Sequence, residues 1–188
     1  YQLLADGSRQ IINFHLPGDL LGSNFGVVPV AGTVAATLTD CLVGRVDGSL
    51  FEQIRRSPGR LAEALHWASA REKAIIQQHL VSIGRRSALA GLAHLLLELG
   101  ERLKLVLLAD DSGFRCPLTQ EHLADALGLT PIHINRMLRE LRRMEALTFR
   151  RGFVHFHDRD KLVRLAEYET GCLEPLSGKR RVAAAALA

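Results

Sequence analysis

Two threonines, each placed to cap the start of a helix, are the residues of this chain that first indicate a chemistry. Thr119 stands immediately before Gln120, and Thr130 stands before Pro131, a residue favoured at the first position of a helix. Gly128 lies between the two segments and can adopt the positive φ that a tight corner between helices needs. This order predicts a helix-turn-helix, an arrangement that allows side chains of the second helix to read base edges in the major groove of DNA.

Apolar residues support both helix starts, whereas capping boxes do not. Leu118 and Leu123 flank the first cap at the positions of a hydrophobic staple, and Leu129 and Ile134 flank the second. Neither segment has Glu or Gln three residues after its threonine. We therefore expect no capping box at either start.

The second helix is expected to have two different faces. Ile134, Leu138 and Leu141 recur at helical spacing and form an apolar stripe that can pack against the rest of the domain. The remaining surface carries Ile132, Asn135, Arg136, Arg139, Arg142 and Arg143. An arginine-rich surface of this kind faces either solvent or phosphate, and the helix by itself leaves both interpretations open.

The residues after this helix favour the phosphate interpretation. Residues 146–157 alternate in polarity on both sides of Arg150-Arg151-Gly152, a pattern typical of a β-hairpin. Residues 136–164 contain nine Lys and Arg against four Asp and Glu, a net charge of +5, while the whole chain has a net charge of +4. The basic excess is therefore concentrated on a predicted winged helix that would approach DNA.

Length and composition set the limits for the remainder. The chain has 188 residues, of which 47% are hydrophobic, enough for a buried core in one or two domains. No apolar run approaches the roughly 20 residues that span a bilayer, and no signal segment opens the chain, so we expect a cytoplasmic protein without a membrane partner. Because Tyr1 comes first and residues 1–4 already read as a strand, we also expect an N-terminal portion to be missing.

Cysteine spacing and known motifs do not indicate a metal site or a catalytic site. Cys41, Cys116 and Cys172 lie far apart without Cys-x-x-Cys or Cys/His spacing, so we interpret them as reduced structural thiols. No Ser/His/Asp order, P-loop or glycine-rich dinucleotide motif occurs in a plausible context. We therefore expect no metal, no catalytic residue and no enzyme activity.

Residues 1–57 are predicted to form a small, partial β-roll. Turns are expected near Gly7 and Gly18, because Asp6-Gly7 and Pro17-Gly18-Asp19 are typical turn sequences. The expected strands lie at residues 1–4, at 11–16 and, as a pair, within 34–46. Short strands separated by regular turns favour a roll or barrel.

Residues 58–84 are predicted to form one long helix and a hinge. The helix has an interrupted apolar stripe made of Leu61, Leu65, Ala68, Ile75, Ile76, Leu80 and Ile83. A helix of about 25 residues with little sequence left to cover this stripe favours pairing with a second copy in a homodimer, as in a coiled coil. The alternative, a helix in the core of one chain, stays open because the heptads are irregular.

Residues 85–170 are predicted to form the DNA-binding domain. Leucines at helical spacing predict its first helix over residues 87–107, followed by a loop at 110–113, and a last helix is expected to end near residue 169. Residues 171–188 carry no packing signal and are predicted to be a mobile tail.

The order of β-roll, long helix and winged helix resembles the Crp/Fnr family of bacterial transcription regulators over nearly the whole chain. Residues 86–96 are similar to the family's entry into its DNA-binding domain, and residues 118–136 to its helix-turn-helix. The resemblance implies an α+β fold with a partial cyclic-nucleotide-binding-like β-roll, a dimerisation helix and a C-terminal winged helix-turn-helix. It also implies a homodimer that binds an inverted repeat in double-stranded DNA, with RNA polymerase as a further partner.

The same resemblance implies which residues contact DNA. Arg136 matches the family's base-reading arginine, whose guanidinium can donate two hydrogen bonds to guanine. Ile132 stands where the family commonly has a glutamate, so the recognised sequence is expected to differ, with an alkyl group that can touch a thymine methyl. The residues expected to read bases are Ile132, Asn135 and Arg136. Those expected to contact the DNA backbone are Gln120, Thr130, His133, Arg139, Arg150 and Arg151.

The predicted sensor half does not match the members that bind cyclic nucleotides. Those members have a Gly-Glu step for the ribose hydroxyl and an Arg-Ser or Arg-Thr for the phosphate. Here Gly22 is followed by Ser23, and Ala31-Gly32-Thr33 lacks the arginine. A buried phosphate without a cation loses its charge-assisted hydrogen bonds. We therefore do not expect a cyclic nucleotide, and the sequence identifies no other effector or cofactor.

One other class of function fits part of the sequence. A cyclic-nucleotide-type regulatory module without direct DNA function would share the β-roll, but the helix-turn-helix and hairpin argue against it. The target genes, and whether they are activated or repressed, stay open.

Overall fold

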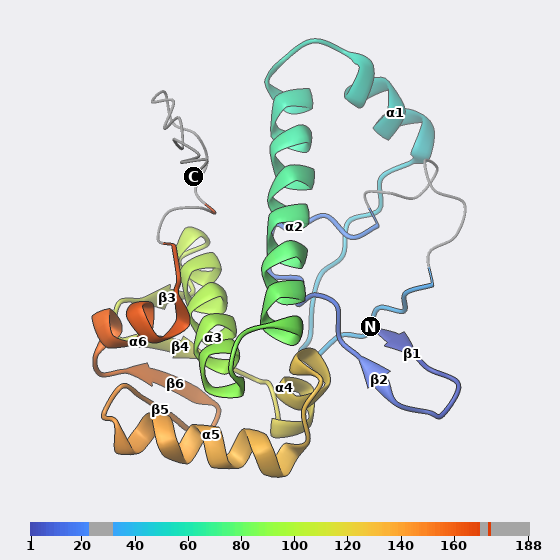
Figure 1. Cartoon of the computed structure of the whole chain (residues 1–188). Coiled ribbons are helices and arrows are strands. Elements are labelled where there is room, and N and C mark those ends of the chain that lie inside the picture. The colour runs from blue at the N-terminus through green and yellow to red at the C-terminus, as the bar shows by residue number, and fades with distance from the viewer. Residues whose placement is uncertain (23–31, 170–172, 174–188) are drawn as a thin grey trace, which may run out of the picture.

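A leucine-rich helix, α3 (Ala88–Leu105), is the element around which the structure is built (Figure 1). The computed structural model describes residues 1–22, 32–169 and 173. Helix α3 lies within the predicted residues 87–107, and Ser87 caps its start, because the Ser87 hydroxyl accepts a hydrogen bond from the Ala90 amide. From Gly91 to Leu103 nearly every residue of α3 is buried, because elements of the C-terminal half cover it on several sides.

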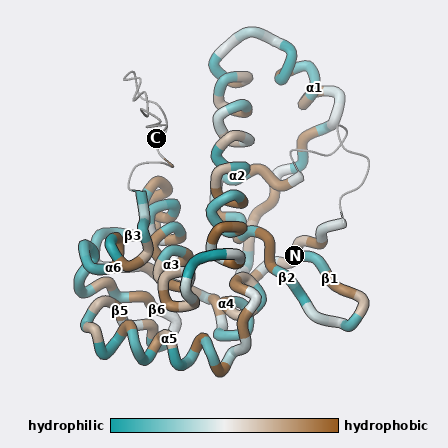
Figure 2. Tube along the Cα trace, viewed as in Figure 1, coloured by the Kyte–Doolittle hydropathy of each residue, from teal (hydrophilic) through white to brown (hydrophobic). Residues whose placement is uncertain are grey.

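The covering elements of the C-terminal half are three further helices and one sheet, and helix α2 (Arg60–Gly84) of the N-terminal half also packs on α3. Helix α6 packs directly on α3, and α5 does so from another side. The sheet has four antiparallel strands in the order β3-β4-β6-β5. The elements are β3 (Ala109–Asp110), β4 (Gly113–Arg115), α4 (Gln120–Leu127), α5 (Pro131–Arg143), β5 (Leu147–Arg150), β6 (Phe153–Phe156) and α6 (Arg159–Ala166). Figure 2 shows α3 mostly in hydrophobic colours, whereas α5 alternates, as expected for a helix with one exposed face.

The expected loop at residues 110–113 is instead the turn of a hairpin, which was missed from the sequence. Strands β3 and β4 pair through it, and β4 pairs in turn with β6, so the wing is the outer part of a larger sheet. Gly113 has a φ of +146°, and a Cβ there would lie 1.9 Å from the Val154 carbonyl oxygen. Only glycine therefore lets β4 approach β6 this closely.

The N-terminal half has fewer strands than expected. The predicted hairpin is present, since β1 (Gln2–Leu3) pairs with β2 (Arg9–Gln10) around a turn in which Gly7 has a φ of +83°. Residues 11–16 were predicted to be a strand, but their backbone groups bond to the helical half instead. The Ile11 amide donates to the Asp125 carbonyl of α4, and the Phe14 carbonyl accepts from the Arg102 side chain of α3.

The two strands expected within residues 34–46 are also absent, and a helix follows where none was predicted. Residues 34–46 are exposed and form no strand, although Val34 exchanges two backbone hydrogen bonds with Tyr1, at 2.8 and 2.9 Å. Helix α1 (Gly48–Arg56) begins where the Asp47 carboxylate accepts from the Ser49 amide, and it lies beside the upper end of α2 (Figure 1). In the described residues the N-terminal half thus contains the two-stranded sheet β1-β2, which is consistent with a partial β-roll.

Helix α2 (Arg60–Gly84) confirms the predicted long helix. Its predicted apolar stripe is largely uncovered within the single chain, because Leu61 is 58% and Leu80 is 70% exposed and Ile83 is also exposed. Ile75 is the buried apolar residue of this helix. This exposure disfavours the alternative of a core helix.

Among the helices that the structure describes, none combines the length and apolar character that a bilayer crossing requires. The predicted mobile tail at residues 171–188 lies outside the described part of the chain, apart from Leu173.

Candidate DNA-binding site

The start of α4 has a capping box, contrary to expectation. The Thr119 hydroxyl accepts from the His122 amide at 3.3 Å, and the His122 Nδ1 accepts from the Thr119 amide at 3.1 Å. The imidazole thus occupies the role that Glu or Gln usually has, because its unprotonated ring nitrogen is an acceptor of similar reach. A search for Glu or Gln alone misses this signal.

The corner and the start of α5 match the prediction. Gly128 ends α4 in the left-handed conformation with a φ of +64°. The Thr130 hydroxyl accepts from the His133 amide at 3.3 Å, and Pro131 occupies the first turn of the helix. The two caps and the glycine therefore fix the angle between α4 and α5.

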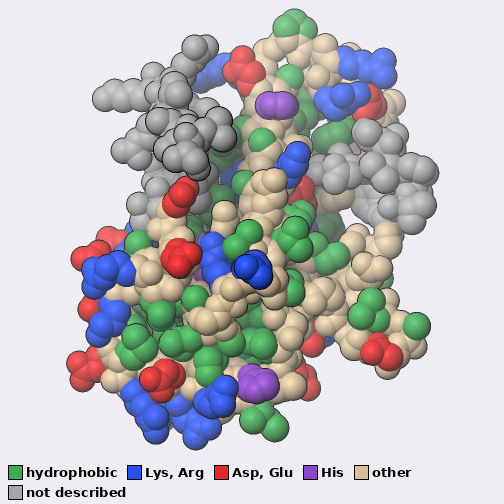
Figure 3. Space-filling view, in the orientation of Figure 1, with side chains coloured by type: hydrophobic (Ala, Val, Ile, Leu, Met, Phe, Trp, Pro, Cys, Tyr) green, Lys and Arg blue, Asp and Glu red, His purple; other side chains and the backbone are tan. Residues whose placement is uncertain are grey.

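Helix α5 has the two predicted faces. Ile134 and Leu141 are fully buried and Leu138 is partly buried, so the apolar stripe holds the helix against the domain. On the opposite face Ile132 is 80% exposed. The other side chains predicted to contact DNA from this helix are also exposed, and they are His133, Asn135, Arg136 and Arg139. Figure 3 shows basic side chains gathered along the lower edge of the molecule, over α5.

A hydrogen bond links the two helices on this exposed side. The Asn135 Nδ2 donates to the Gln120 Oε1 at 3.3 Å. Gln120 is the first residue of α4, and Asn135 lies in the second turn of α5. The structure thus brings together two residues that the sequence placed in the interface separately.

The wing carries its arginines at the tip. Arg150, the last residue of β5, pairs with Phe153, the first residue of β6. The two residues between them, Arg151 and Gly152, have φ values of +52° and +71°. Positive φ at both central residues is typical of the turn that fits the twist of a hairpin. The Cys116 amide donates to the Gly152 carbonyl at 2.9 Å and ties this turn to the end of β4. Arg150 and Arg151 are both exposed.

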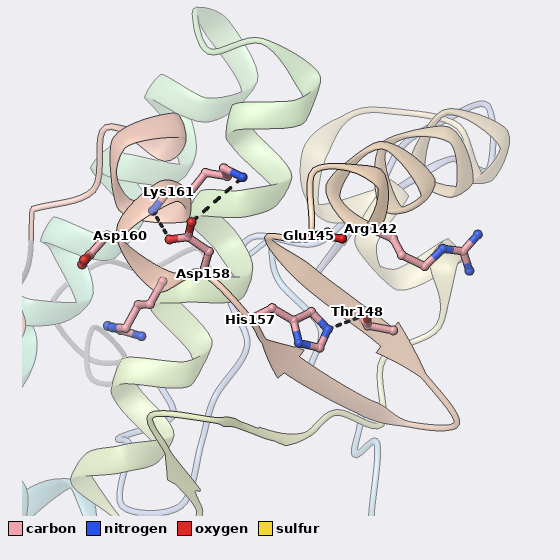
Figure 4. Close-up of a pocket in the computed structure, with 8 residues that line it drawn as sticks. Arg142, Glu145, Thr148, His157, Asp158, Asp160 and Lys161 are labelled. Atoms are coloured by element: carbon pink, nitrogen blue, oxygen red, sulfur yellow. Dashed lines mark hydrogen bonds and ion pairs between the residues drawn. The ribbon is translucent and has the colours of Figure 1, made fainter.

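A shallow pocket beside the wing has a structural role (Figure 4). It is lined by charged side chains of both signs from α5, α6 and the connecting loops, and by Thr148 of β5. The Asp158 carboxylate caps α6 by accepting from the Lys161 amide at 2.8 Å, and the Lys161 Nζ donates to the Met144 carbonyl at 2.7 Å. Because these groups already bond to one another and to backbone, we assign the pocket no ligand.

The described cysteines have no metal partners. No cluster of His, Cys, Asp or Glu suited to a metal occurs among the residues that the structure describes. Burial raises the pKa of the Cys116 thiol to about 11, so it stays protonated near neutral pH. Cys41 is exposed, and Cys172 lies outside the described residues.

Together these features define a winged helix-turn-helix protein with an exposed, basic second helix. Residues 92–165 match the model of the Crp-like helix-turn-helix domain. The chain is 33% identical over 167 residues to the nitrogen fixation regulation protein FixK of Bradyrhizobium diazoefficiens, covering 88% of this chain and 69% of that protein. The chain therefore belongs to the Crp/Fnr family of bacterial transcription regulators, and its C-terminal half is the family's DNA-binding domain.

Two further comparisons agree. The transcriptional activator protein FnrL of Cereibacter sphaeroides is 31% identical over 145 residues, covering 76% of this chain and 58% of that protein. The structure of FixK2 from Bradyrhizobium japonicum superimposes with a TM-score of 0.66 at 27% identity, covering 90% of this chain and 82% of that one. The chain thus spans roughly three fifths to four fifths of the length of these relatives.

Proposed function

We propose that the protein binds an inverted-repeat DNA site as a two-fold dimer and regulates transcription from it. The observation that carries the proposal is the exposure of the predicted contact residues on one face of α5 and at the tip of the wing. In this proposal the base-reading side chains are Ile132, Asn135 and Arg136. The backbone contacts come from Gln120, Thr130, His133, Arg139, Arg150 and Arg151.

The roles follow from the chemistry of each side chain. Arg136 can donate two hydrogen bonds to the O6 and N7 of a guanine, and Ile132 can contact a thymine methyl. Arg150 and Arg151 are long cations at a hairpin tip, suited to phosphate oxygens beside the groove. The caps of α4 and α5 bring helix N-termini, which favour anions, to the same surface.

The dimer rests on the uncovered stripe of α2. Apolar side chains such as Leu61, Leu80 and Ile83 lie exposed on this helix, and a second copy of the helix would remove them from water. A two-fold dimer places two recognition helices about 34–36 Å apart, one turn of DNA. The recognised site is then an inverted repeat.

A regulator of this kind acts in the cytoplasm on the chromosome, with RNA polymerase as a further partner and without turnover of a substrate. FixK and FnrL carry names that describe regulation and activation. No effector is assigned, because most of the segment where a cyclic nucleotide would be expected, residues 22–33, lies outside the described residues.

Selection of bound fragments from random DNA tests this function, together with sedimentation of the protein with and without the selected site. We expect an inverted repeat, a dimer at micromolar concentration, and much weaker binding to a single half-site. Binding without sequence preference, or a monomer under both conditions, contradicts the proposal. Sedimentation of Leu80→Glu against Gln77→Glu, an exposed neutral polar position of the same helix, separates loss of the apolar contact from the effect of one added negative charge.

A further inference from the structure

The hydrogen bond between α4 and α5 restricts what Asn135 can read. A side-chain amide has two N–H donors and one oxygen that accepts. One N–H of Asn135 is used by the Gln120 Oε1, at 3.3 Å. One N–H and the Oδ1 are then left to face the DNA, a donor beside an acceptor.

Adenine is the base that complements this pair. In the major groove adenine presents the N7 acceptor next to the N6 donor, whereas guanine presents two acceptors, cytosine a donor, and thymine an acceptor with a methyl group. From this geometry we propose that Asn135 reads adenine and that Gln120 is the positioning residue that holds its amide in the reading orientation. The inference rests on the proposed function, since it requires α5 to lie in the major groove.

The other end of Gln120 has a complementary role. Because its Oε1 faces Asn135, its amide nitrogen still has two N–H groups to donate, and phosphate oxygens are acceptors. Gln120 begins α4 directly after the Thr119 cap, so its backbone position is fixed. A phosphate bound by Gln120 and an adenine bound by Asn135 are thereby held in one register along the DNA.

Neighbouring side chains fit this assignment. Ile132 lies three residues before Asn135, and both are exposed on the surface that also carries Arg136. A half-site that offers a thymine methyl, an adenine and a guanine in close succession would engage all three. Asn135 thus lets the protein distinguish adenine from the other bases at a position that Arg136 does not read.

The first experiment removes single acceptor atoms from the DNA. After the site of the wild-type protein has been selected, each adenine of a half-site is replaced in turn by 7-deaza-adenine, which pairs normally but lacks N7. We expect one position at which binding falls by about 5- to 150-fold for the wild type. For Asn135→Ala we expect the same replacement to change binding less than about 2-fold.

The second experiment uses matched variants of Gln120. Gln120→Glu keeps an oxygen to accept from Asn135 but repels phosphate, so we expect weaker binding to all sites with the adenine preference retained. Gln120→Met keeps the length of the side chain and loses the acceptor, so we expect the preference at that base pair to fall as well. In an Asn135→Ala background, Gln120→Met should change no base preference. Thermal melting of each variant shows whether the fold is kept.

The outcomes distinguish failure of the adenine assignment from failure of the proposed DNA-binding function. If the wild type selects a site but tolerates 7-deaza-adenine at every position, or if Gln120→Glu and Gln120→Met lose the preference equally, the inference is wrong and the proposed function stands. If the wild type selects no sequence at all, both are wrong. If only a guanine position responds to Asn135→Ala, Asn135 reads a different base from the one proposed.

Discussion

Glu98 and Arg102 lie one turn apart on α3 and form an ion pair of 2.9 Å, although their side chains are only 2% and 1% exposed. Arg102 also donates to the Phe14 carbonyl at 2.6 Å and to the Asp19 carboxylate at 2.7 Å. On the other side, Glu98 is 2.7 Å from the Nε2 of His79 on α2. These buried contacts tie the N-terminal segment and the long helix to the DNA-binding domain.

Removing one partner of this pair is expected to destabilise the protein strongly. Arg102→Met leaves the Glu98 and Asp19 carboxylates without their shared cation, and breaking a buried pair costs about 3–5 kcal/mol. The measurement is the free energy of unfolding from urea denaturation. Arg143→Met is the matched control, since Arg143 is 80% exposed and lies 3.6 Å from Glu140, a geometry worth about 0–1 kcal/mol. Equal losses in the two variants would contradict the assignment.

The same cluster predicts a pH dependence through His79. Both ring nitrogens face acceptors, the Ile12 carbonyl at 3.0 Å and the Glu98 carboxylate at 2.7 Å, and only a protonated ring donates to both. Burial by itself lowers the pKa of His79, but the hydrogen bond and charge of Glu98 and the bond to Ile12 outweigh it, while Arg102 opposes them. The result is a pKa above the usual value.

The sign of the effect follows from this direction. A raised pKa in the folded state stabilises the protein fully below about pH 6.5, the unfolded value, and this contribution is lost as pH rises through the folded pKa. Urea denaturation at several pH values should therefore show stability of the wild type falling above pH 6.5 relative to His79→Gln. His94 has the opposite pH dependence. Burial lowers its pKa to about 4, so the stability that its neutral ring contributes is lost as the pH falls from about 6.5 toward 4. A wild type and His79→Gln with parallel profiles above pH 6.5 would disprove the protonated assignment.

Local signals in the sequence were sufficient for the winged helix-turn-helix. The caps at Thr119 and Thr130, the left-handed Gly128 and the apolar stripe through Ile134 are determined by neighbours within a few residues, so they could be found without long-range information. The wing turn at Arg151 is of the same kind. The exposed face of α5 then follows from helical periodicity alone.

Features that depend on distant segments could not be found this way. Residues 11–16 have a strand-like pattern, but their backbone groups bond to α4 and to side chains from α2 and α3, more than 60 residues away. The burial of Arg102 contradicts the usual exposure of arginine and needs Asp19 and Glu98 as partners. The Gln120–Asn135 bond likewise requires the angle between two helices, which the sequence of either one does not give.

The histidine capping box predicts how substitutions at the start of α4 change the stability of the protein. Thr119→Ala removes the hydroxyl that accepts from the His122 amide, whereas the Thr119 amide can still donate to the His122 Nδ1. We therefore expect a loss of about 0.5–2 kcal/mol in the free energy of unfolding. His122→Glu should retain stability, because a carboxylate at this position also accepts from the Thr119 amide. His122→Ala is the control for losing the acceptor. A loss in His122→Glu as large as that in His122→Ala would show that the imidazole does not act as a cap.

The last prediction divides the arginines between specificity and affinity. Arg136→Ala should lose about 1–3 kcal/mol per half-site and relax the preference at one base pair, because a bidentate contact to guanine is removed. Arg150→Ala and Arg151→Ala should weaken all sequences about equally and flatten the slope of log affinity against log salt by about one unit per lost contact per subunit. Competition binding with single-base variants of the site, repeated at several salt concentrations, separates these effects.

Arg56→Ala is the matched control, since this 77% exposed arginine lies on α1, at the opposite end of the molecule from α5, and should change neither quantity (Figure 1). If a wing variant shifts the base preference while Arg136→Ala leaves it intact, the roles assigned to the helix and the wing are reversed.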